Sequence, residues 1–368
     1  MCSSPLFRRI GIVGVGLIGG SLGLAVGLKS LAGEVIGFGR CPEGLRAARE
    51  CGAVNTASTD FGPLSGCDLV ILATPVGSTP GVMQEIAPFL APGATVTDVG
   101  STKAGIVSQA AQILPRNTVF IGGHPMAGSE KEGISGADPF LFENALYVLT
   151  PLPGAPADHL QRLTGLVEGV GARPVIMDPL EHDLSVAAVS HLPHLVAATL
   201  VNCLFDFPGS EKISLLAAGG FRDTTRIAAS SPGMWRDIFI SNRRFVLEAL
   251  SAFSARLEEF REAVESGDPG KIHGLLDRAR SLKSGMPART RGYLPAMWEI
   301  VATVPDRPGI IGLMAVKLGD AGINITDIEI LRVREGEGGT IRLAFASPED
   351  QERAVSLLEK AGIPARGR

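Results

Sequence analysis

A histidine that follows an apolar run is the residue whose position most suggests chemistry in this chain. Residues 118 to 121 form a short apolar run typical of a buried strand, and His124 follows it in the sequence Gly122-Gly123-His124-Pro125. Ligands of open α/β sheets bind outside the carboxyl ends of the strands, where this histidine would lie. An imidazole with an unperturbed pKa of about 6.5 can act as a neutral base near pH 7. His124 is therefore a candidate proton acceptor, although a loop histidine that caps a turn would show the same pattern.

A glycine loop near the start of the chain predicts a dinucleotide site. An apolar run over residues 9 to 13 precedes Gly14-Val15-Gly16-Leu17-Ile18-Gly19, and a helical pattern follows from Gly20 to Lys29. In such a loop the first glycine permits a tight turn, the second lets the backbone approach a pyrophosphate, and the third allows close helix packing. The flanking strand and helix favour a nucleotide site over a glycine-rich turn. We expect the cofactor, NAD or NADP, to be bound by Gly14, Gly16, Leu17, Ile18 and Gly19 of this loop, with Thr74 and Pro75 after a later strand.

The end of the second predicted strand bears on the choice between NAD and NADP. NAD enzymes usually carry an acidic residue there, which hydrogen-bonds the adenosine ribose, but this chain has Gly39-Arg40. The Arg40 guanidinium could pair with a 2′-phosphate, which favours NADP slightly. If Arg40 only stacks on the adenine, NAD fits as well.

Composition points to a small-molecule partner. The chain has 368 residues, a net charge of −4 and a sequence pI near 5.9, so no general basic field for nucleic acid is expected. Its five cysteines are scattered, which suggests neither a disulfide framework nor a zinc site and fits a reducing cytoplasm. The first strand begins too early for a signal peptide, and no apolar run approaches the roughly 18 residues of a membrane helix.

Three composition regimes divide the chain. Short apolar runs alternate with helical patterns up to about residue 177, helical patterns alone continue to about residue 284, and a strand-helix-strand-strand-helix-strand pattern closes the chain. We therefore expect an α/β Rossmann-type nucleotide-binding domain over 1–178 and an all-α domain over 179–286. A linker over 287–296 and a βαββαβ module over 297–368 follow. The long apolar pattern over residues 241 to 264 could pack within the chain or form a dimer interface.

Two further clusters carry polar side chains. Ser101 and Lys103 follow a predicted strand, where Ser101 could cap a helix or orient an imidazole, and Lys103 could contact the cofactor or be solvated. In the helical regime His191 and His194 share a helical face, with Pro193 expected to kink or interrupt the helix. We interpret them as core histidines rather than as a pair of metal ligands, because no carboxylate follows at the spacing of a third metal ligand.

Arginines after a glycine pair could receive a dicarboxylate. Arg222, Arg226 and Arg236 lie near Gly219-Gly220 and Trp235, and guanidinium forks suit carboxylates. Asp223 could hold Arg226 in place, or the two could form an exposed salt bridge that contributes little.

These motifs together resemble the prephenate/arogenate dehydrogenases of tyrosine biosynthesis. The resemblance covers residues 9 to 284 and rests on the glycine loop, residues 98–103, 123–130, 190–194 and 219–237, in order and at similar spacing. It implies that His124 is the catalytic histidine, with Ser101 beside it, and that Arg226 grips a substrate carboxylate. It places the following residues in the same pocket: Ser129, Glu130, His191, His194, Asp223 and Trp235. Gly39-Arg40 departs from the aspartate of many NAD-dependent members.

The tail resembles an ACT regulatory domain. Its first helix lies between Asp306-Arg307-Pro308-Gly309 and Asn324-Ile325, and we expect these two segments to hold a regulatory ligand. The resemblance implies a homodimeric cytoplasmic enzyme that oxidatively decarboxylates prephenate or arogenate, with tyrosine as a possible effector bound between paired tails. A tail that only strengthens the dimer is the alternative.

Two other functions fit the residues less well. A 3-hydroxyacid dehydrogenase would need a catalytic lysine and asparagine on a helix after the nucleotide domain, and we find no such pair. A non-catalytic amino-acid sensor would not need an intact glycine loop together with Ser101, His124 and Arg226.

Overall fold

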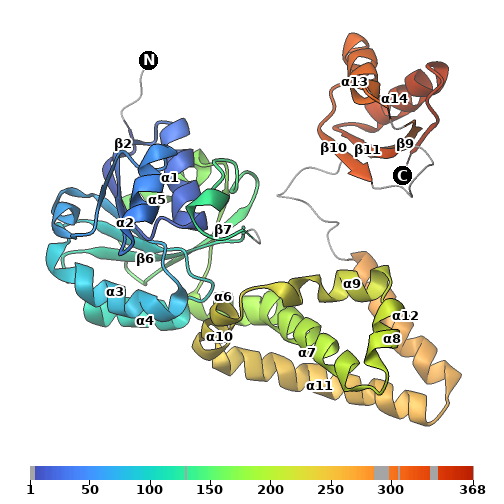
Figure 1. Cartoon of the computed structure of the whole chain (residues 1–368), viewed down its shortest axis with the longest axis horizontal. Coiled ribbons are helices and arrows are strands. Elements are labelled where there is room, and N and C mark those ends of the chain that lie inside the picture. The colour runs from blue at the N-terminus through green and yellow to red at the C-terminus, as the bar shows by residue number, and fades with distance from the viewer. Residues whose placement is uncertain (1–4, 129–130, 286–297, 306, 332–338, 368) are drawn as a thin grey trace. The chain divides into compact units, whose positions relative to one another are not determined.

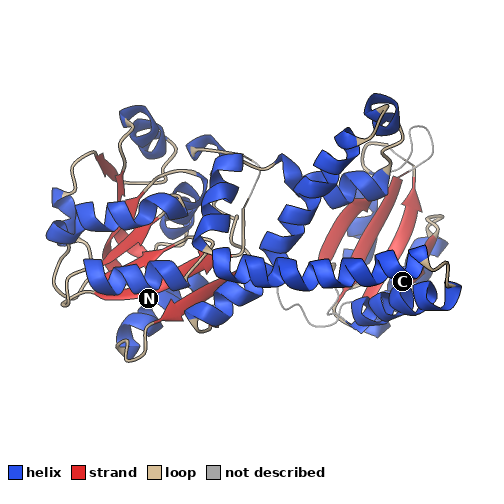
Figure 2. Cartoon of the chain, turned by 90° about the horizontal axis from the view of Figure 1, so that it is seen from below, coloured by secondary structure: helices blue, strands red, loops and turns tan. Residues whose placement is uncertain are grey.

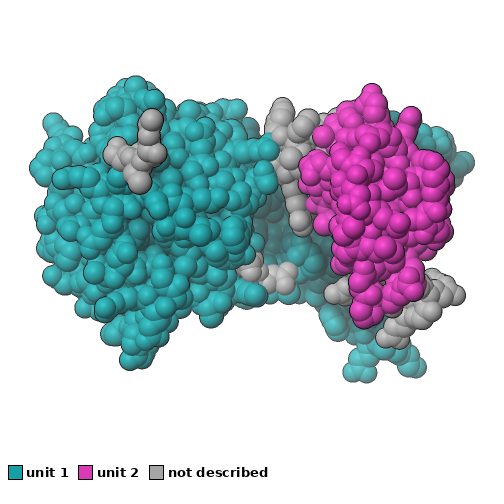
Figure 3. Space-filling model, turned by 90° about the horizontal axis from the view of Figure 1, so that it is seen from above, with its two compact units in different colours: residues 1–287 teal, residues 288–368 magenta. Residues whose placement is uncertain are grey.

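The computed structural model describes residues 5–128, 131–285, 298–305, 307–331 and 339–367. The chain divides into two compact units, Met1–Pro287 and Ala288–Arg368 (Figure 3). The predicted linker and three predicted site residues, Ser129, Glu130 and Asp306, lie outside the described residues.

The first unit begins with an eight-stranded sheet in the order β3-β2-β1-β4-β5-β6-β7-β8. All neighbouring strands are parallel except β6 and β7, which are antiparallel. The strands are β1 Phe7–Val13, β2 Ala32–Phe38, β3 Thr56–Ser58, β4 Leu69–Leu72, β5 Thr95–Asp98, β6 Val119–Pro125, β7 Leu146–Pro151 and β8 Arg173–Ile176. The predicted α/β Rossmann-type architecture is confirmed.

Helices cover both faces of this sheet (Figures 1 and 2). Leu22 of α1 and Leu163 of α5 pack into one buried cluster, and Met83 of α3 and Ile106 of α4 pack into the other. Each cluster buries the apolar side chains of the central strands, so β4 is buried along its whole length. The helices are α1 Leu17–Leu28, α2 Pro42–Glu50, α3 Thr79–Ile86, α4 Ala104–Ile113 and α5 Ala157–Gly169. Short 3₁₀ turns are Gly62–Gly66, Val76–Ser78, Ala87–Phe89 and Ile134–Gly136.

His124 lies inside β6 rather than just beyond it, which corrects the sequence-based placement. The residues of β6 up to Ile121 pair with β5, whereas Gly123, His124 and Pro125 pair with the antiparallel strand β7. Because β6 also pairs with β7, it continues beyond residues 118 to 121, the apolar run from which the strand was predicted. His124 still lies near the carboxyl end of β6.

The rest of the first unit is helical among its described residues. Its elements are α6 Pro179–Val186, the π-helical turn η5 Ala187–His191, α7 Leu192–Asp206, α8 Ser210–Leu215, α9 Gly219–Thr225, the 3₁₀ turn η6 Arg226–Ala229, α10 Pro232–Ser241, α11 Arg243–Glu265 and α12 Pro269–Gly285. The long helix expected over residues 241 to 264 starts at Arg243, because α10 ends at Ser241. Pro193 does not interrupt the helix: the wide turn η5 lies directly before it and accommodates the residue that lacks an N–H group.

Together α6, η5 and α7 form one continuous helix of 28 residues from Pro179 to Asp206. Judged only by its length and composition, this helix could cross a membrane, which corrects the expectation that no apolar run approaches the length of a membrane helix. Sequence inspection missed it because polar residues near its start broke the apolar run. Within the chain much of this helix is exposed, including Leu200 and Phe205. Such a surface suits burial against another apolar surface.

The second unit has the predicted order of elements. Its elements are β9 Trp298–Val304, α13 Ile310–Asp320, β10 Asp327–Leu331, β11 Gly339–Phe345, α14 Pro348–Lys360 and β12 Ala365–Gly367, and its antiparallel sheet has the order β10-β11-β9-β12. Ile300 and Leu343 of the sheet pack against Met314 of α13 and Leu358 of α14 in one buried cluster. The unit thus has a core of its own.

Candidate functional site

The glycine loop has the geometry that a pyrophosphate site requires. Gly14 has φ +97°, and a Cβ there would lie 2.5 Å from the carbonyl oxygen of Ala73. A Cβ on Gly19 would lie 2.1 Å from the carbonyl oxygen of Gly14, so α1 packs as closely as only glycine allows. Gly16 faces open space, and α1 begins after it without an acidic residue in its first turn. The positive end of α1 is therefore free to attract an anion.

A cavity of about 480 Å³ lies beside this loop. Four residues predicted to bind the cofactor line it: Gly14, Arg40, Thr74 and Pro75. Cys41 and Glu85 also line it. Predicted contacts Leu17 and Ile18 form the first turn of α1. The cavity joins the glycine loop to the end of β2, which is where the adenosine half of a dinucleotide lies in this fold.

Lys103 is directed away from solvent. Its side chain is completely buried and its ammonium group pairs with the buried Asp98 carboxylate. Asp98 also accepts hydrogen bonds from the backbone N–H groups of Gly100, at 2.8 Å, and Gly123, at 3.1 Å. Burial lowers the pKa of Lys103, and Asp98 opposes that shift. The pair fixes the loop after β5 against the strand that carries His124, and a cofactor contact by Lys103 stays a prediction.

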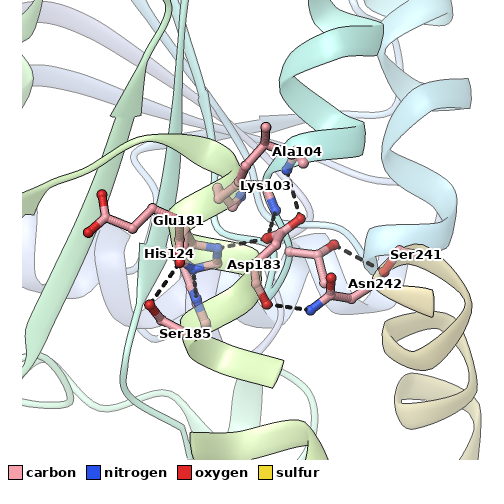
Figure 4. Close-up of polar contacts among 12 residues, drawn as sticks. Lys103, Ala104, His124, Glu181, Asp183, Ser185, Ser241 and Asn242 are labelled. Carbon is pink, nitrogen blue, oxygen red and sulfur yellow. Dashed lines mark hydrogen bonds and ion pairs between the residues drawn. The ribbon is translucent and has the colours of Figure 1, made fainter. Parts of the chain in front are cut away.

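His124 is the first member of a hydrogen-bonded chain of three residues (Figure 4). Its Nδ1 lies 2.8 Å from Nε2 of His182, and Nδ1 of His182 lies 2.8 Å from Oδ1 of Asp183. Both carboxylate oxygens of Asp183 accept backbone N–H groups at the start of α4, from Lys103 at 2.7 Å and from Ala104 at 2.9 Å. A carboxylate at the N-terminus of a helix is in a favourable field. The chain ties β6, α6 and α4 together.

His124 is held in its neutral form. Burial is the main cause that lowers its pKa well below the ordinary value, and the neighbouring His182, Lys103 and His191 lower it further. Its side chain nevertheless keeps partial exposure at the edge of the sheet. A neutral, accessible imidazole can accept a proton from a bound ligand.

Asn242 borders this chain, and Ser101 precedes Lys103 in the loop after β5. Ser101 is partly exposed, and α4 has no side-chain cap from its own loop, so the predicted capping role of Ser101 is wrong. Asp183 takes that role instead. The side-chain amide of Asn242 donates to the carbonyl oxygen of Asp183 at 2.8 Å and lies 3.1 Å from Nδ1 of His191. Burial lowers the pKa of His191 to about 4.

An aromatic cluster continues from His191 into α10. The rings of His194 and Trp235 stack with centroids 3.6 Å apart and planes 7° apart. Nδ1 of His194 and Nε1 of Trp235 are buried and have no hydrogen-bond partner among the described residues. Two buried polar atoms without hydrogen bonds are costly unless a ligand or water bonds to them. This cluster is therefore a candidate binding surface for a polar group.

The helix that carries Trp235, α10, also contacts the turn after Pro75, which borders the cavity beside the glycine loop. A Cβ on Gly77, in the turn after Pro75, would lie 2.6 Å from Oδ2 of Asp237 in α10. Arg236 bonds Asp237 through two of its nitrogens. Arg226 begins η6, which directly follows α9 in the chain; Arg226 and Asp223 of α9 are both exposed. The structure thus brings the His194–Trp235 cluster close to the residues that follow β4.

The predicted regulatory residues in the second unit lie near α13. Gly309 has φ +88° and caps that helix, with Arg307 and Pro308 directly before it. Asn324 is exposed, while Ile325 packs against the core of the unit. Their role as a ligand site stays a prediction.

Sequence reasoning missed His182 and Asp183. His182 is 58 residues from His124 in the chain, and Asp183 is 80 residues from Lys103. The adjacent His-Asp pair near the start of the predicted all-α domain was the available signal. Sequence alone did not indicate that the pair would point into the sheet domain.

Two family models match the first unit. Residues 22–176 match the model for the prephenate dehydrogenase nucleotide-binding domain, and residues 178–278 match the model for the prephenate dehydrogenase dimerization domain. The exposed apolar helix from Pro179 to Asp206 falls within the second match.

Known relatives cover most of the chain. It is 38% identical to a prephenate dehydrogenase of Bacillus subtilis over 356 residues, which is 95% of both chains. A prephenate dehydrogenase structure from A. aeolicus, in complex with hydroxyphenyl propionate and NAD+, is 31% identical with a TM-score of 0.70. It covers 77% of this chain and 100% of that one. A Synechocystis arogenate dehydrogenase structure is 32% identical with a TM-score of 0.67, covering 75% of this chain and 99% of that one.

Proposed function

Since the chain belongs to the prephenate dehydrogenase family, we propose that it catalyses the NAD(P)-dependent oxidative decarboxylation of prephenate to 4-hydroxyphenylpyruvate in tyrosine biosynthesis. The observation that carries this proposal is the neutral, partly exposed His124 at the carboxyl edge of a dinucleotide-binding sheet. A base at that edge can reach a substrate placed beside a bound nicotinamide.

The residues around the cavity fit a dinucleotide. The N-terminus of α1 and Gly16 would hold the pyrophosphate, and the cavity bordered by Arg40, Thr74 and Pro75 would hold the adenosine half. The oxidised nicotinamide supplies a hydride acceptor when it is bound. The A. aeolicus structure contains NAD+. Our preference for NADP in this chain rests on Arg40 and on the absence of an acidic residue at position 39.

His124 would accept the proton of the C4 hydroxyl group as the hydride leaves C4. The ring then becomes a dienone, and loss of the C1 carboxylate as CO₂ makes it aromatic. Lys103 is too deeply buried to meet the substrate, but its positive charge helps to keep His124 unprotonated. Ser101, partly exposed on the loop after β5, would hydrogen-bond the same hydroxyl group or the imidazole.

The other end of the substrate would lie against the helical part of the first unit. Nδ1 of His194 and Nε1 of Trp235 have no hydrogen-bond partner in the part of the chain that the structure describes, and they would bond polar groups of the substrate. Arg226 would bind a substrate carboxylate through its guanidinium fork. Ser129, Glu130, His191 and Asp223 complete the proposed pocket. Prephenate and arogenate differ at a side-chain keto or amino group, and arogenate is the alternative substrate.

The remaining proposals concern assembly and regulation. The match to a dimerization domain and the exposed apolar helix from Pro179 to Asp206 support a homodimer. We propose a cytoplasmic location, because the cysteines suggest no disulfide framework. The second unit would bind tyrosine near Arg307 to Gly309 and Asn324, and would thereby regulate the enzyme.

A direct assay tests the function. Purified protein is mixed with prephenate or arogenate and with NAD or NADP, and reduced nicotinamide is followed by absorbance. We expect the highest kcat/KM with prephenate and NADP. No signal in any of the four combinations would overturn the proposal, and a signal with arogenate alone would replace the substrate.

A further inference from the structure

We propose that Asp183 and His182 are positioning residues that fix His124 in the one neutral tautomer whose Nε2 can accept a proton. The inference rests on the proposed function of His124 and deepens it. It assigns to α6 of the helical part a role in the reaction at the sheet edge, although neither residue is placed against the substrate.

The argument begins at Asp183, which is almost completely buried. Its carboxylate receives three N–H groups: the backbone groups of Lys103 and Ala104 and the ring Nδ1 of His182. An ionised carboxylate only accepts hydrogen bonds, so it satisfies all three donors. The helix N-terminus stabilises the negative charge. Asp183 therefore requires a proton on Nδ1 of His182.

The next step follows from the chemistry of neutral imidazole, which carries one donor and one acceptor nitrogen. If Nδ1 of His182 is the donor, its Nε2 is the acceptor. That nitrogen lies 2.8 Å from Nδ1 of His124, so His124 must carry its proton on Nδ1. Nε2 of His124 is then left with a free lone pair. Without this chain, the two tautomers of His124 would compete, and only one of them is a base at Nε2.

The positions of the three residues make the chain a link between the two parts of the first unit. His124 comes from β6, while His182 and Asp183 come from α6, at the start of the segment that matches the dimerization domain. Figure 4 shows Asp183 beside Lys103 and Ala104 at the start of α4. Asp183 also bonds the ring of His182, which in turn bonds His124. The correct tautomer of His124 is thus set only when α6 packs against α4.

The tautomer can be measured without any substrate. The chain has six histidines, so selective ¹⁵N-histidine labelling gives few ring signals, and His124→Asn identifies those of His124. In the unaltered protein we expect Nδ1 of His124 to be protonated and Nε2 to be bare. Observation of the proton on Nε2 would overturn the proposal, whether or not the protein oxidises prephenate.

Two pairs of variants test the consequence for the reaction. His182→Leu removes the acceptor for Nδ1 of His124, whereas His182→Gln can place an amide oxygen near the same position. We expect His182→Leu to lower kcat by roughly 10²- to 10⁴-fold, the span associated with a general base. KM should change less, and His182→Gln should recover part of kcat. Equal kcat in the two variants, or an unchanged His124 tautomer in His182→Leu, would contradict the proposal.

The second pair separates the tautomer from helix capping. Asp183→Ala breaks the chain and also removes the cap of α4. Asp178→Ala removes a cap of the same kind from α6, where Asp178 accepts the N–H groups of Leu180 and Glu181, but leaves the chain intact. Both variants should have a lower Tm. Only Asp183→Ala should lose kcat and change the His124 tautomer, and equal effects in the two variants would show that Asp183 acts through stability alone.

Discussion

The proposed preference for NADP depends on two adjacent residues, Gly39 and Arg40, and the exposure of Arg40 limits the size of the expected effect. Arg40 is exposed at the rim of the cavity, where water weakens an ion pair. We therefore assign about 1 to 2 kcal/mol to its contact with a 2′-phosphate, below the upper range for charged hydrogen bonds. Arg40→Ala should weaken NADP binding by about 5- to 30-fold at 1.4 kcal/mol per tenfold. NAD binding should change little.

The matching substitution at position 39 should move the preference in the opposite sense. A Cβ on Gly39 would have its nearest neighbour, Cδ2 of Leu45, at 3.5 Å, which is ordinary van der Waals contact, so the backbone there accepts a side chain. Gly39→Asp would repel a 2′-phosphate and offer a hydrogen bond to the ribose of NAD. We expect a lower KM for NAD together with a higher KM for NADP.

The assay is kcat/KM for each cofactor at saturating substrate, with Kd measured by fluorescence of the reduced form. Arg46→Ala is the matched control, because it removes the same charge from α2 at an exposed position outside the cavity. It should leave the ratio of the two cofactors unchanged. Equal losses of NAD and NADP in Arg40→Ala would refute the phosphate contact and indicate stacking on the adenine.

Three further predictions test the pocket, the base and the tail. Arg226→Ala should mainly raise KM, and Arg226→Lys should recover little of the lost affinity, because an ammonium group cannot bind a carboxylate through two parallel N–H groups. A collapse of kcat at unchanged KM would contradict this role. Since burial lowers the pKa of His124, kcat/KM should not fall as pH drops through 6.5 but only at lower pH, and an acid limb at 6.5 or above would count against the assignment. Truncation within residues 287–295 should leave activity but abolish inhibition by tyrosine, a coupling of about 1 to 3 kcal/mol. Equal inhibition of both forms would show that tyrosine competes at the substrate site.

Much of the fold could be predicted because its signals are local. The glycine loop, the apolar strands and the order of elements in the second unit all follow from residues close together in the chain. Predictions from local signals were wrong where the structure depends on other parts of the chain. The end of β6 depends on pairing with β7, and the π-helical turn η5 before Pro193 is not revealed by the spacing of apolar residues.

The candidate site could be proposed from the sequence where a motif indicates its own chemistry, as the motif around His124 does. The residues that we propose to position His124 could not be predicted, since Asp183 bonds backbone groups that no side-chain pattern reveals. Lys103 shows a related difficulty. In the sequence it is a cation after a strand, whereas in the structure it is a buried partner of Asp98.

The central claim is that His124 is the proton acceptor, and kcat of His124→Asn tests it most directly. His159→Asn is the matched control, because His159 is hydrogen-bonded to Thr95 at the amino end of β5 and has no proposed part in the reaction. With prephenate and the preferred cofactor, His124→Asn should lower kcat by roughly 10²- to 10⁴-fold with a smaller change in KM, while His159→Asn retains kcat. A near-normal kcat in folded His124→Asn would contradict the account.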